Sequence, residues 1–354
     1  MNKPVRTLLT SLTICTLAAC GGGGGGTSTI GSAILGMAVS ADASKLYLAN
    51  ADKQVIQSLT LSSSAVATYA GGTGSVGTAN GTALVARFYE PFSLVNVPSG
   101  GQDVLYIADT YNQGIRKIDA AGTVTTVAGT LGTSGASDGT GSSARFNFPK
   151  GITSDGIHLY VADAFNHLVR KVTTAGVVTT LAGTSGTSGY VDGSTGVKFY
   201  APFSLAATTT YVYVSDTGNN SIRSVKISDS TVATVAGSTS GVTGTTDAAG
   251  TAARFNTPAA IVSDGANILY VADSANHTIR KIDLGNSNTV TTIAGTAGTS
   301  GSTDATGAAA RFSNPTGLAL DTTNGILYVS DQNYTKVRKI VLSTGVVTTV
   351  NASF

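Results

Sequence analysis

Tryptophan is absent from this 354-residue sequence, and cysteine, histidine and glutamate are scarce. The two cysteines, Cys15 and Cys20, both lie in the first twenty residues, so no disulfide can staple the rest of the chain and stability must come from an apolar core. Glu90 is the single glutamate among 19 acidic residues. Because Glu, Lys and Leu favour helices, whereas the abundant Thr, Val, Gly and Asp favour strands and turns, the composition excludes a mainly helical protein.

Charge is also scarce, at 11% of residues, and it is balanced. Without Lys3 and Arg6 of the first 19 residues, 19 basic side chains stand against 19 acidic ones. No basic cluster follows, so we expect no nucleic-acid partner, because phosphate backbones are held by clustered Lys and Arg. No later apolar run reaches the eighteen residues that indicate a transmembrane helix.

The N-terminus has the pattern of an export signal. Lys3 and Arg6 precede an apolar run from Leu8 to Ala19, and Leu17-Ala18-Ala19-Cys20 resembles a bacterial lipobox. This predicts a signal peptide at 1–19, a lipidated Cys20 and a glycine-rich tether at 20–33, with membrane lipid as a partner through Cys20. The absence of Asp after Cys20 resembles the sorting pattern for the outer membrane, facing the periplasm or the cell surface. The alternatives are an ordinary secretory signal or a cytoplasmic start.

A unit of 53 to 59 residues recurs six times after the tether. Each copy has a (Leu/Val)-Tyr-(Val/Leu/Ile)-(Ala/Ser)-(Asp/Asn) strand, with Tyr at 47, 106, 160, 213, 270 and 328. Three residues after each Tyr is an acid or amide, namely Asn50, Asp109, Asp163, Asp216, Asp273 or Asp331. Seven residues further on is Gln57, Arg116, Arg170, Arg223, Arg280 or Arg338. The first copy therefore departs from the others at both positions, and the repeat indicates one domain rather than several.

Four strand patterns separated by turn residues fill each unit, which predicts an all-β, six-bladed β-propeller of four-stranded antiparallel blades over residues 34–354. The alternative is a β-solenoid, whose repeats are shorter and need no hairpins. The first and last units each have four strands of their own, so we expect a monomeric ring that closes by packing between blades one and six, without a strand borrowed from the other terminus.

The repeat resembles the NHL family, whose name is spelled by Asn166-His167-Leu168; Asn276-His277-Thr278 is a near match. The resemblance covers about residues 34 to 354 and implies a propeller. It says less about activity, because NHL propellers include RNA binders, protein-interaction scaffolds and a zinc lyase of peptide amidation, and the similar six-bladed lactonases are calcium enzymes. Blade one departs from the pattern at Asn50 and Gln57, and blade six has Tyr334 where other copies have Asn.

Strand direction predicts a working surface. In an up-and-down blade, the turn between the second and third strands and the link to the next blade lie at the same end of the ring. Binding residues expected in these turns are Tyr111, Asn112, Phe165, Asn166, Asn219, Asn276 and Tyr334. Basic residues expected there, before the Phe of each link, are Arg87, Arg145, Lys198, Arg254 and Arg311. A cationic ring is one interpretation of these five; the preferred one pairs them with the aspartates of the links.

Groups suited to catalysis are few. Of the three histidines, His167 and His277 occupy the same repeat position, so a three-histidine zinc site in the channel is hard to build. No nucleophile elbow or phosphate-binding loop is present. We therefore expect no metal, no cofactor and no catalytic residue. The sequence predicts a membrane-anchored binding or scaffold module for a protein, peptide or glycan; the alternatives are a metal-dependent hydrolase or lyase and a purely structural surface protein.

Overall fold

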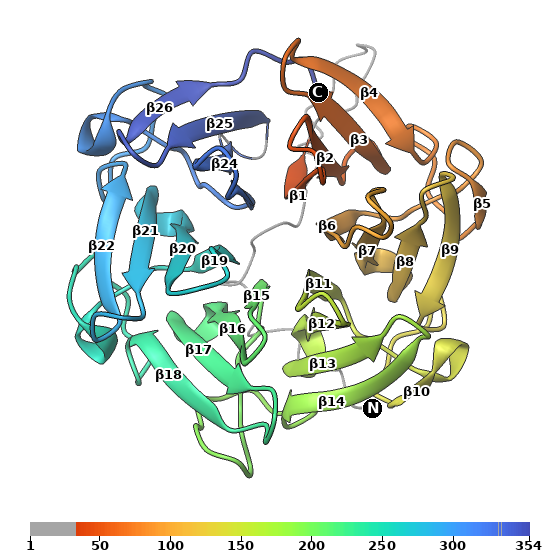
Figure 1. Ribbon diagram of the computed structural model, residues 1–354. Coiled ribbons are helices and arrows are strands. Elements are labelled where there is room, and N and C mark those ends of the chain that lie inside the picture. Colours follow the sequence, from red (N-terminus) through yellow and green to blue (C-terminus); the bar gives the residue numbers. More distant parts are fainter. Residues whose placement is uncertain (1–32, 332, 334) are drawn as a thin grey trace, which may run out of the picture. The chain divides into compact units, whose positions relative to one another are not determined.

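A computed structural model describes residues 33–331, 333 and 335–354 of the chain. The predicted signal peptide, Cys20 and nearly all of the tether lie outside the described residues, as does Tyr334. Six antiparallel sheets surround a central axis, and each holds four strands that are consecutive in the main repeat (Figure 1). The prediction of a six-bladed β-propeller is confirmed, and the solenoid alternative is wrong.

Within each blade the chain runs from the innermost to the outermost strand. Blade one consists of β1 (Ile34–Val39), β2 (Lys45–Asn50), β3 (Val55–Thr60) and β4 (Ala65–Ala70). Blade two consists of β6 (Pro91–Asn96), β7 (Leu105–Asp109), β8 (Gly114–Ile118) and β9 (Thr123–Ala128). Blade three consists of β11 (Pro149–Ser154), β12 (His158–Asp163), β13 (Leu168–Thr173) and β14 (Val177–Gly183). Blade four consists of β15 (Leu205–Ala207), β16 (Tyr211–Asp216), β17 (Ser221–Lys226) and β18 (Val232–Gly237). Blade five consists of β19 (Pro258–Ser263), β20 (Ile268–Asp273), β21 (Thr278–Asp283) and β22 (Thr289–Ala294). Blade six consists of β23 (Leu318–Asp321), β24 (Ile326–Asp331), β25 (Lys336–Val341) and β26 (Val346–Thr349).

Each link between blades also covers the outer strand of the blade that it enters. The two-residue strands β5 (Gly81–Thr82) and β10 (Gly139–Thr140) pair antiparallel with β9 and β14. In blades four to six, single bridges do the same: Gly193 with Val232, Ala249 with Thr289, and Thr306 with Val346. We call residues 80–82, 138–140, 192–193, 247–249 and 304–306 the straps. The repeat pattern did not predict them, because two residues are too few to show a strand period.

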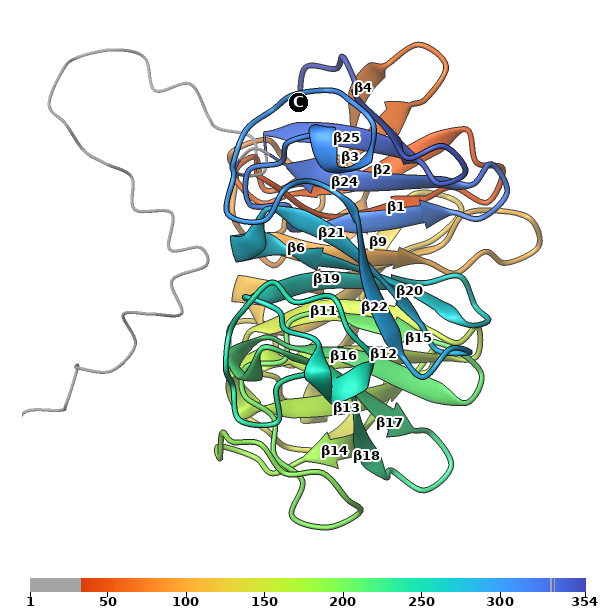
Figure 2. The same cartoon turned by 90° about the vertical axis from the view of Figure 1, so that its left-hand side faces the viewer.

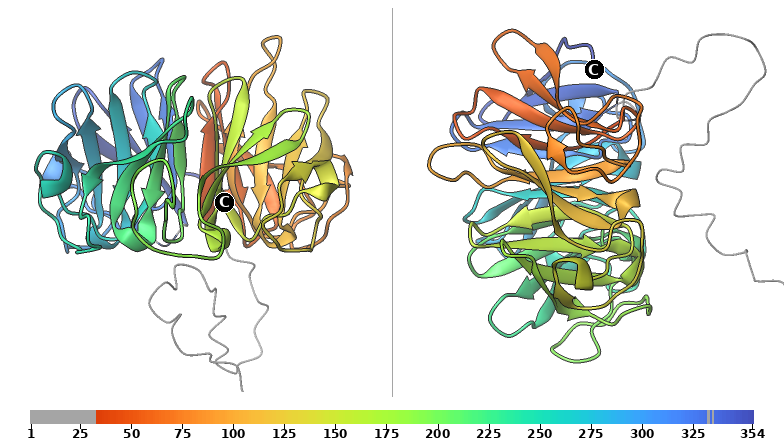
Figure 3. Two further views of the ribbon diagram at one scale, coloured as in Figure 1. Left: turned by 90° about the horizontal axis from the view of Figure 1, so that it is seen from below. Right: turned by 90° about the vertical axis from the view of Figure 1, so that its right-hand side faces the viewer.

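The strands run from one face of the ring to the other (Figures 2 and 3). Since each blade begins and ends at the same face, its link and its turn between the second and third strands meet there, as predicted. In blades two to five that turn is one turn of 3₁₀ helix: η1 (Thr110–Asn112), η3 (Ala164–Asn166), η4 (Thr217–Asn219) and η6 (Ser274–Asn276). We call this end of the ring the loop face.

The core consists of apolar clusters between neighbouring blades. The Phe of every link is fully buried in one of them: Phe88, Phe146, Phe199, Phe255 and Phe312. Blades six and one meet through a cluster that includes Ile34 and Met37 of β1 and Ala319 of β23. Each of these two blades is built from its own four consecutive strands. Closure by packing, without an exchanged strand, is therefore confirmed for the described residues.

A buried arginine fastens each link to the blade that it enters. Arg170 on β13 has no exposed surface, and its Nη1 donates to Asp163 Oδ2 at 2.7 Å and to the carbonyl oxygen of Arg145 at 3.0 Å. Its Nη2 donates to Asp138 Oδ1 at 2.8 Å and to the carbonyl oxygen of Ser137 at 3.0 Å. The guanidinium carbon also lies 5.2 Å from the centre of the Phe146 ring. One side chain thus binds its link at two places, the strap and the residue before the buried Phe.

The carboxylate of Asp163, which pairs with Arg170, is hydrogen-bonded at both of its oxygens. Asp163 Oδ1 accepts from the backbone N–H of Asn147 at 2.7 Å, and Oδ2 accepts from Asn166 Nδ2 at 2.8 Å. Burial raises the pKa of Asp163 to about 6, whereas the bonds from Asn147, Asn166 and Arg170 act in the opposite direction. We call the Asp, Asn and Arg of each blade, with the link atoms they bind, the clamp. It recurs around Arg116, Arg223 and Arg280; around Arg338 the Asp and Arg recur, with Tyr334 at the position of the Asn.

Blade one replaces the ionic pair by a neutral one. Asn50 Nδ2 donates to Gln57 Oε1 at 2.8 Å, so no charge is buried at this position. The described residues include no strap in front of blade one. In the other blades a strap Asp, or Asn80 in blade two, accepts from the second guanidinium nitrogen. The amide pair therefore avoids leaving part of a buried guanidinium unpaired.

We expect Arg170→Ala to lower the free energy of unfolding by about 3–5 kcal/mol, because it leaves Asp163 buried without its counter-charge and three link acceptors without donors. Urea-induced unfolding measures this loss. Gln57→Ala at the same position of blade one is the matched control, and its loss should be near 1 kcal/mol because only a neutral bond disappears. Equal losses for the two variants would contradict the proposed role of the clamp.

Candidate functional site

The six innermost strands surround a channel with a cavity of about 310 Å³. Its lining is apolar with a few hydroxyl and amide groups, and none of the lining side chains is charged or an imidazole. General acid–base catalysis and metal binding both need such groups. The channel therefore offers a ligand shape and hydrogen bonds, and its lining supplies no group that titrates near neutral pH.

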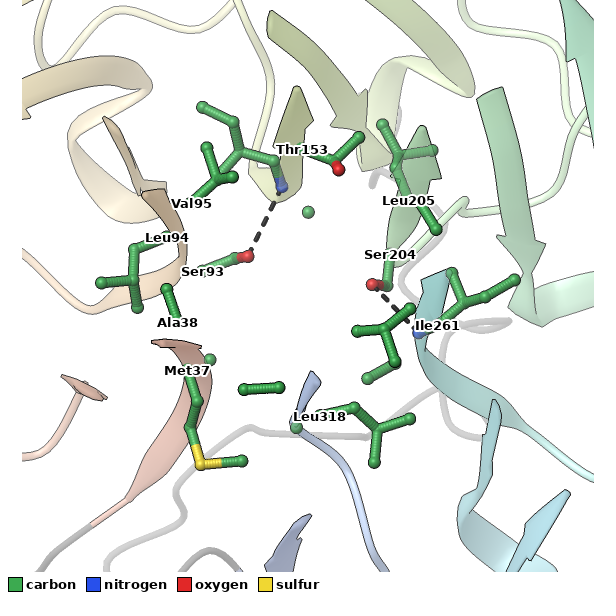
Figure 4. A pocket seen from close by; sticks show the side chains of 18 of the residues that line it. Met37, Ala38, Ser93, Leu94, Val95, Thr153, Ser204, Leu205, Ile261 and Leu318 are labelled. Atoms are coloured by element: carbon green, nitrogen blue, oxygen red, sulfur yellow. Dashed lines mark hydrogen bonds between the residues drawn. The ribbon is translucent and has the colours of Figure 1, made fainter. Parts of the chain in front are cut away.

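Small residues let the inner strands approach closely around this channel. A Cβ atom on Gly36 or Gly151 would lie 2.7 Å from a carbonyl oxygen of the next blade, so only glycine fits there. Ser93 and Ser204 lie against these two glycines. The Ser93 hydroxyl accepts from the backbone N–H of Ile152 in the following blade, and the Ser204 hydroxyl accepts from that of Ile261 at 3.3 Å (Figure 4). The channel wall is thus cross-linked between blades.

Two aromatic rings and a lysine lie at the end of the channel where the inner strands begin. Phe92 of blade two and Phe203 of blade four meet edge to face, with ring centres 5.0 Å apart. Lys150 of blade three places Nζ 5.3 Å and 4.9 Å from the two ring centres. These three residues therefore bring blades two, three and four into contact at this end of the channel. The sequence analysis did not identify them.

A row of aromatic side chains crosses the loop face of blades two and three. The ring centres of Tyr89 and Tyr111 are 5.0 Å apart, those of Tyr111 and Phe148 are 4.8 Å apart, and those of Phe148 and Phe165 are 4.6 Å apart. Tyr89 and Phe165 remain 36% and 40% exposed. We call these four residues the aromatic row. Tyr111 and Phe165 were predicted binding residues, whereas Phe148, in the left-handed position before Pro149, was missed.

The row is rigid and breaks the sixfold symmetry. The backbone N–H of Tyr111 donates to the carbonyl oxygen of Tyr89 at 3.1 Å, and that of Phe148 donates to Gln113 Oε1 at 2.7 Å. Blades five and six have no aromatic residue at the corresponding positions, which are Asn256, Thr257, Ala275, Ser313, Asn314 and Asn333. A feature that serves the repeat recurs in every blade, so this one is not needed for the fold.

Two carboxyl groups lie beside the start of the row. Glu90 follows Tyr89 directly, and its backbone N–H donates to Gln54 Oε1 of blade one at 2.6 Å. Burial raises the pKa of Glu90, and the charge of Asp52 raises it further. Burial also raises the pKa of Asp52. This end of the row therefore combines flat apolar rings with hydrogen-bonding carboxyl groups.

The other predicted turn residues belong to the clamps. Asn112, Asn166, Asn219 and Asn276 are at most 7% exposed, and each amide donates to the clamp aspartate of its blade. Each also donates to a glycine carbonyl oxygen of the link, at 2.6 to 2.8 Å. Their side chains are thus occupied in fastening links and do not form part of the accessible face. Tyr334 is outside the described residues.

The predicted pairing of the five basic residues with the link aspartates is wrong. The strap aspartates bind the clamp arginines instead, as Asp138 binds Arg170. Arg145 Nη1 donates to the carbonyl oxygens of Ser142 and Ala144, and Arg87, Arg254 and Arg311 make the equivalent bonds. Lys198 pairs through its backbone with Val191. None of the five lines the channel, because each is tied to its own link.

The repeated histidines connect neighbouring blades. His167 Nδ1 accepts from the backbone N–H of Ala201 at 3.1 Å, and His277 Nδ1 accepts from that of Asn314 at 3.2 Å. Gln113 and Asn220 accept the same bond elsewhere in the ring. The imidazole must therefore be neutral at Nδ1, and burial lowers the pKa of His167.

A lowered pKa in the folded state means that His167 contributes its full stabilisation above its ordinary pKa, about 6.5. This contribution is lost as the pH falls from there through the lower pKa of the folded protein. We expect the unfolding free energy of the wild type to fall relative to that of His167→Gln as the pH is lowered from about 8 to about 5, because glutamine keeps the acceptor and does not titrate. Urea unfolding at several pH values measures the difference. A difference independent of pH would contradict this expectation.

Among the described residues, no group of three His, Cys, Asp or Glu side chains lies close enough together to hold a metal ion. The helices of the described part are single turns, and none has the length and apolar character needed to cross a bilayer.

Comparison with curated proteins finds several that are similar in sequence over most of this chain. No family model matches the chain. The protein SUPPRESSOR OF QUENCHING 1 of Arabidopsis thaliana is 27% identical over 290 residues, which are 78% of this chain and 27% of that protein. NHL repeat-containing protein 2 of Homo sapiens is 27% identical over 293 residues, which are 72% of this chain and 40% of that protein. The chain thus spans well under half the length of these relatives.

Solved structures share the fold. A protein of unknown function and an auxiliary nutrient binding protein, both from Bacteroides thetaiotaomicron, superpose with TM-scores of 0.66 and 0.64 at 17% and 16% identity. These matches cover 88% and 91% of this chain and 70% of each of those chains. Virginiamycin B lyase of Staphylococcus aureus matches with a TM-score of 0.54 at 13% identity, over 91% of this chain and 85% of that one. The repeat and the ring show a six-bladed β-propeller, and its sequence is similar to those of NHL repeat-containing proteins.

Proposed function

We propose that this propeller is a non-catalytic binding module of the bacterial cell envelope, and that the aromatic row on its loop face binds glycan chains. The observation that carries the proposal is the row itself, because it departs from the symmetry of the fold and leaves Tyr89 and Phe165 partly exposed. Exposed aromatic rings that the fold does not need are typical of ligand contacts.

The chemistry of the row favours a sugar. Flat rings spaced 4.6 to 5.0 Å apart offer a continuous apolar surface to the C–H face of a pyranose ring. Glu90 and Asp52 add carboxyl groups that accept hydrogen bonds from sugar hydroxyls. The auxiliary nutrient binding protein that shares the fold is consistent with such a role, although that likeness carries the fold alone.

A metal-dependent hydrolase or lyase is less well supported. Calcium and zinc sites need carboxylate, imidazole or thiolate ligands that converge on one point. The channel lining has none of these groups, and the likeness to virginiamycin B lyase is one of fold.

The binding proposal predicts that Phe165→Ala weakens oligosaccharide binding about fivefold, which corresponds to about 1 kcal/mol for one stacking ring. Calorimetric titration against a panel of soluble oligosaccharides measures the effect. Val242→Ala is the matched control, because it removes an apolar side chain of similar exposure from the link into blade five. If Phe165→Ala binds like the wild type, or if only peptides bind, the glycan proposal fails.

Anchoring at Cys20 is a separate part of the proposal. Cys20→Ser should abolish incorporation of labelled fatty acid and leave the precursor uncleaved at this site, because the thiol that carries the lipid is gone. Cys15→Ser, inside the predicted signal peptide, should be labelled and processed normally. Metabolic labelling followed by electrophoresis distinguishes the two. Undiminished labelling of the Cys20→Ser protein would end the lipoprotein interpretation.

A further inference from the structure

A groove between blades four and five lies at the end of the ring opposite the loop face. It has a volume of about 590 Å³. One wall is formed by β16, β17 and β18 of blade four with the turn at 208–210, and the other by 265–267, Leu284 and Asn288 of blade five. Turns such as that between β17 and β18 lie at this end (Figure 2). The groove is therefore separate from the links, the clamps and the aromatic row.

Blade four departs from the repeat at three positions that line this groove. Ser224 lies opposite Tyr213 in the sheet, where four other blades have a lysine, namely Lys117, Lys171, Lys281 and Lys339. Lys226 stands where the other blades have Thr60, Asp119, Thr173, Asp283 and Val341. Tyr211 stands where they have Lys45, Val104, His158, Ile268 and Ile326. Because residues that serve the repeat recur around the ring, the fold does not require these three.

The hydroxyl of Tyr213 is a donor without an acceptor. Tyr213 is 7% exposed and lines the groove, and among the described residues no group accepts from its hydroxyl. In blade three the equivalent Tyr160 hydroxyl donates to Asp155 Oδ2 at 2.8 Å. Thr208 takes the place of Asp155 in blade four, since the backbone N–H of each donates to the carbonyl oxygen three residues on. Burial raises the pKa of Tyr213, so the hydroxyl keeps its proton.

Lys226 supplies the charge of the groove. No Asp or Glu is among the lining side chains, and Lys226 is the one lining residue with a charged group. Its Nζ lies 2.7 Å from Asp229 Oδ2, and the two side chains are 42% and 45% exposed. A surface ion pair of this kind holds its partners weakly. Lys226 also lies diagonally across the strands from Tyr213, on the same side of the sheet and within reach of a long side chain.

The remaining walls carry neutral groups that suit a hydroxylated molecule. The ring centres of Tyr211 and Tyr213 are 6.0 Å apart, so they offer a flat apolar surface on blade four. Asn267 and Asn288 line the groove from blade five, and each amide has both donor and acceptor atoms.

We propose that this groove binds a small hydroxylated carboxylate such as a sugar acid, whose carboxylate accepts from the Tyr213 hydroxyl and the Lys226 ammonium group. The ligand thereby supplies the acceptor that Asp155 supplies within blade three. The amides of Asn267 and Asn288 bond the ligand hydroxyls from the facing wall. The site lies at the other end of the ring from the aromatic row and does not depend on it.

Calorimetric titration of the full chain with D-glucuronate, D-galacturonate and D-gluconate tests the proposal. We expect at least one of these acids to bind, and D-glucose, which has no carboxylate, to bind at least about tenfold more weakly. Tyr213→Phe keeps the ring and removes only the hydroxyl, so it should weaken binding of the acid about tenfold. Tyr160→Phe is the matched control, because it removes the same hydroxyl outside the groove, and it should bind like the wild type.

Lys226→Asp is a second variant, since blades two and five have Asp119 and Asp283 at this position and fold with them. It should abolish binding of the acid, because a carboxylate would then face a carboxylate. Thr173→Asp places the same charge at the equivalent position of blade three and should leave binding unchanged.

Three results would overturn the proposal: no binding of any of the three acids, equal binding of D-glucose, or undiminished binding by Lys226→Asp. Phe165→Ala separates the groove from the aromatic row and should bind the acid like the wild type. Loss of acid binding in Phe165→Ala would place the ligand on the row and would also overturn the proposal. Failure of the row to bind oligosaccharides would leave the groove unaffected.

Discussion

The buried guanidinium group of each clamp is the constraint from which most of this structure follows. A fully buried charge must be paired and hydrogen-bonded, because an unpaired one costs several kcal/mol. Arg170 meets this requirement with Asp163, the strap acid Asp138 and carbonyl oxygens of the link. The repeated Asp, Arg and Phe of blades two to six, with the Asn of blades two to five, are therefore members of one network that satisfies the buried arginine. Because the polar atoms of these residues are already bonded to each other and to the links, they are not available to bind a ligand.

Because the clamps fasten the links, the loop face is a fixed platform and not a set of independent loops. Variation is then confined to positions that the clamps do not use, such as the residue before each proline and the middle residue of each turn. The aromatic row occupies these positions in blades two and three, where Phe148 lies between Tyr111 and Phe165. A binding surface can be built there without cost to the ring, since no clamp atom is displaced.

Blade one shows what happens when one part of the network changes. Its neutral Asn50–Gln57 pair stands where the other blades have an Asp–Arg pair, and the described residues include no strap in front of it. The seam to blade six is closed by apolar contacts around Ile34 and Met37. In the described part of the chain, blade one is thus attached to blade six by packing and to blade two by hydrogen bonds such as that from Tyr47 to Asp103.

The sequence by itself determined the number of blades, the four strands of each, their order and the face on which links and turns meet, because strand periodicity and turn residues are local and recur six times. It also indicated that Asp163 and Arg170 serve the fold. Only the tertiary structure decided which partners they take: Asp138 binds Arg170 and not Arg145, since a strap lies over the strand that carries Arg170. The aromatic row was likewise hidden, because Tyr89, Tyr111, Phe148 and Phe165 come from two links and two turns that are brought together only when neighbouring blades pack.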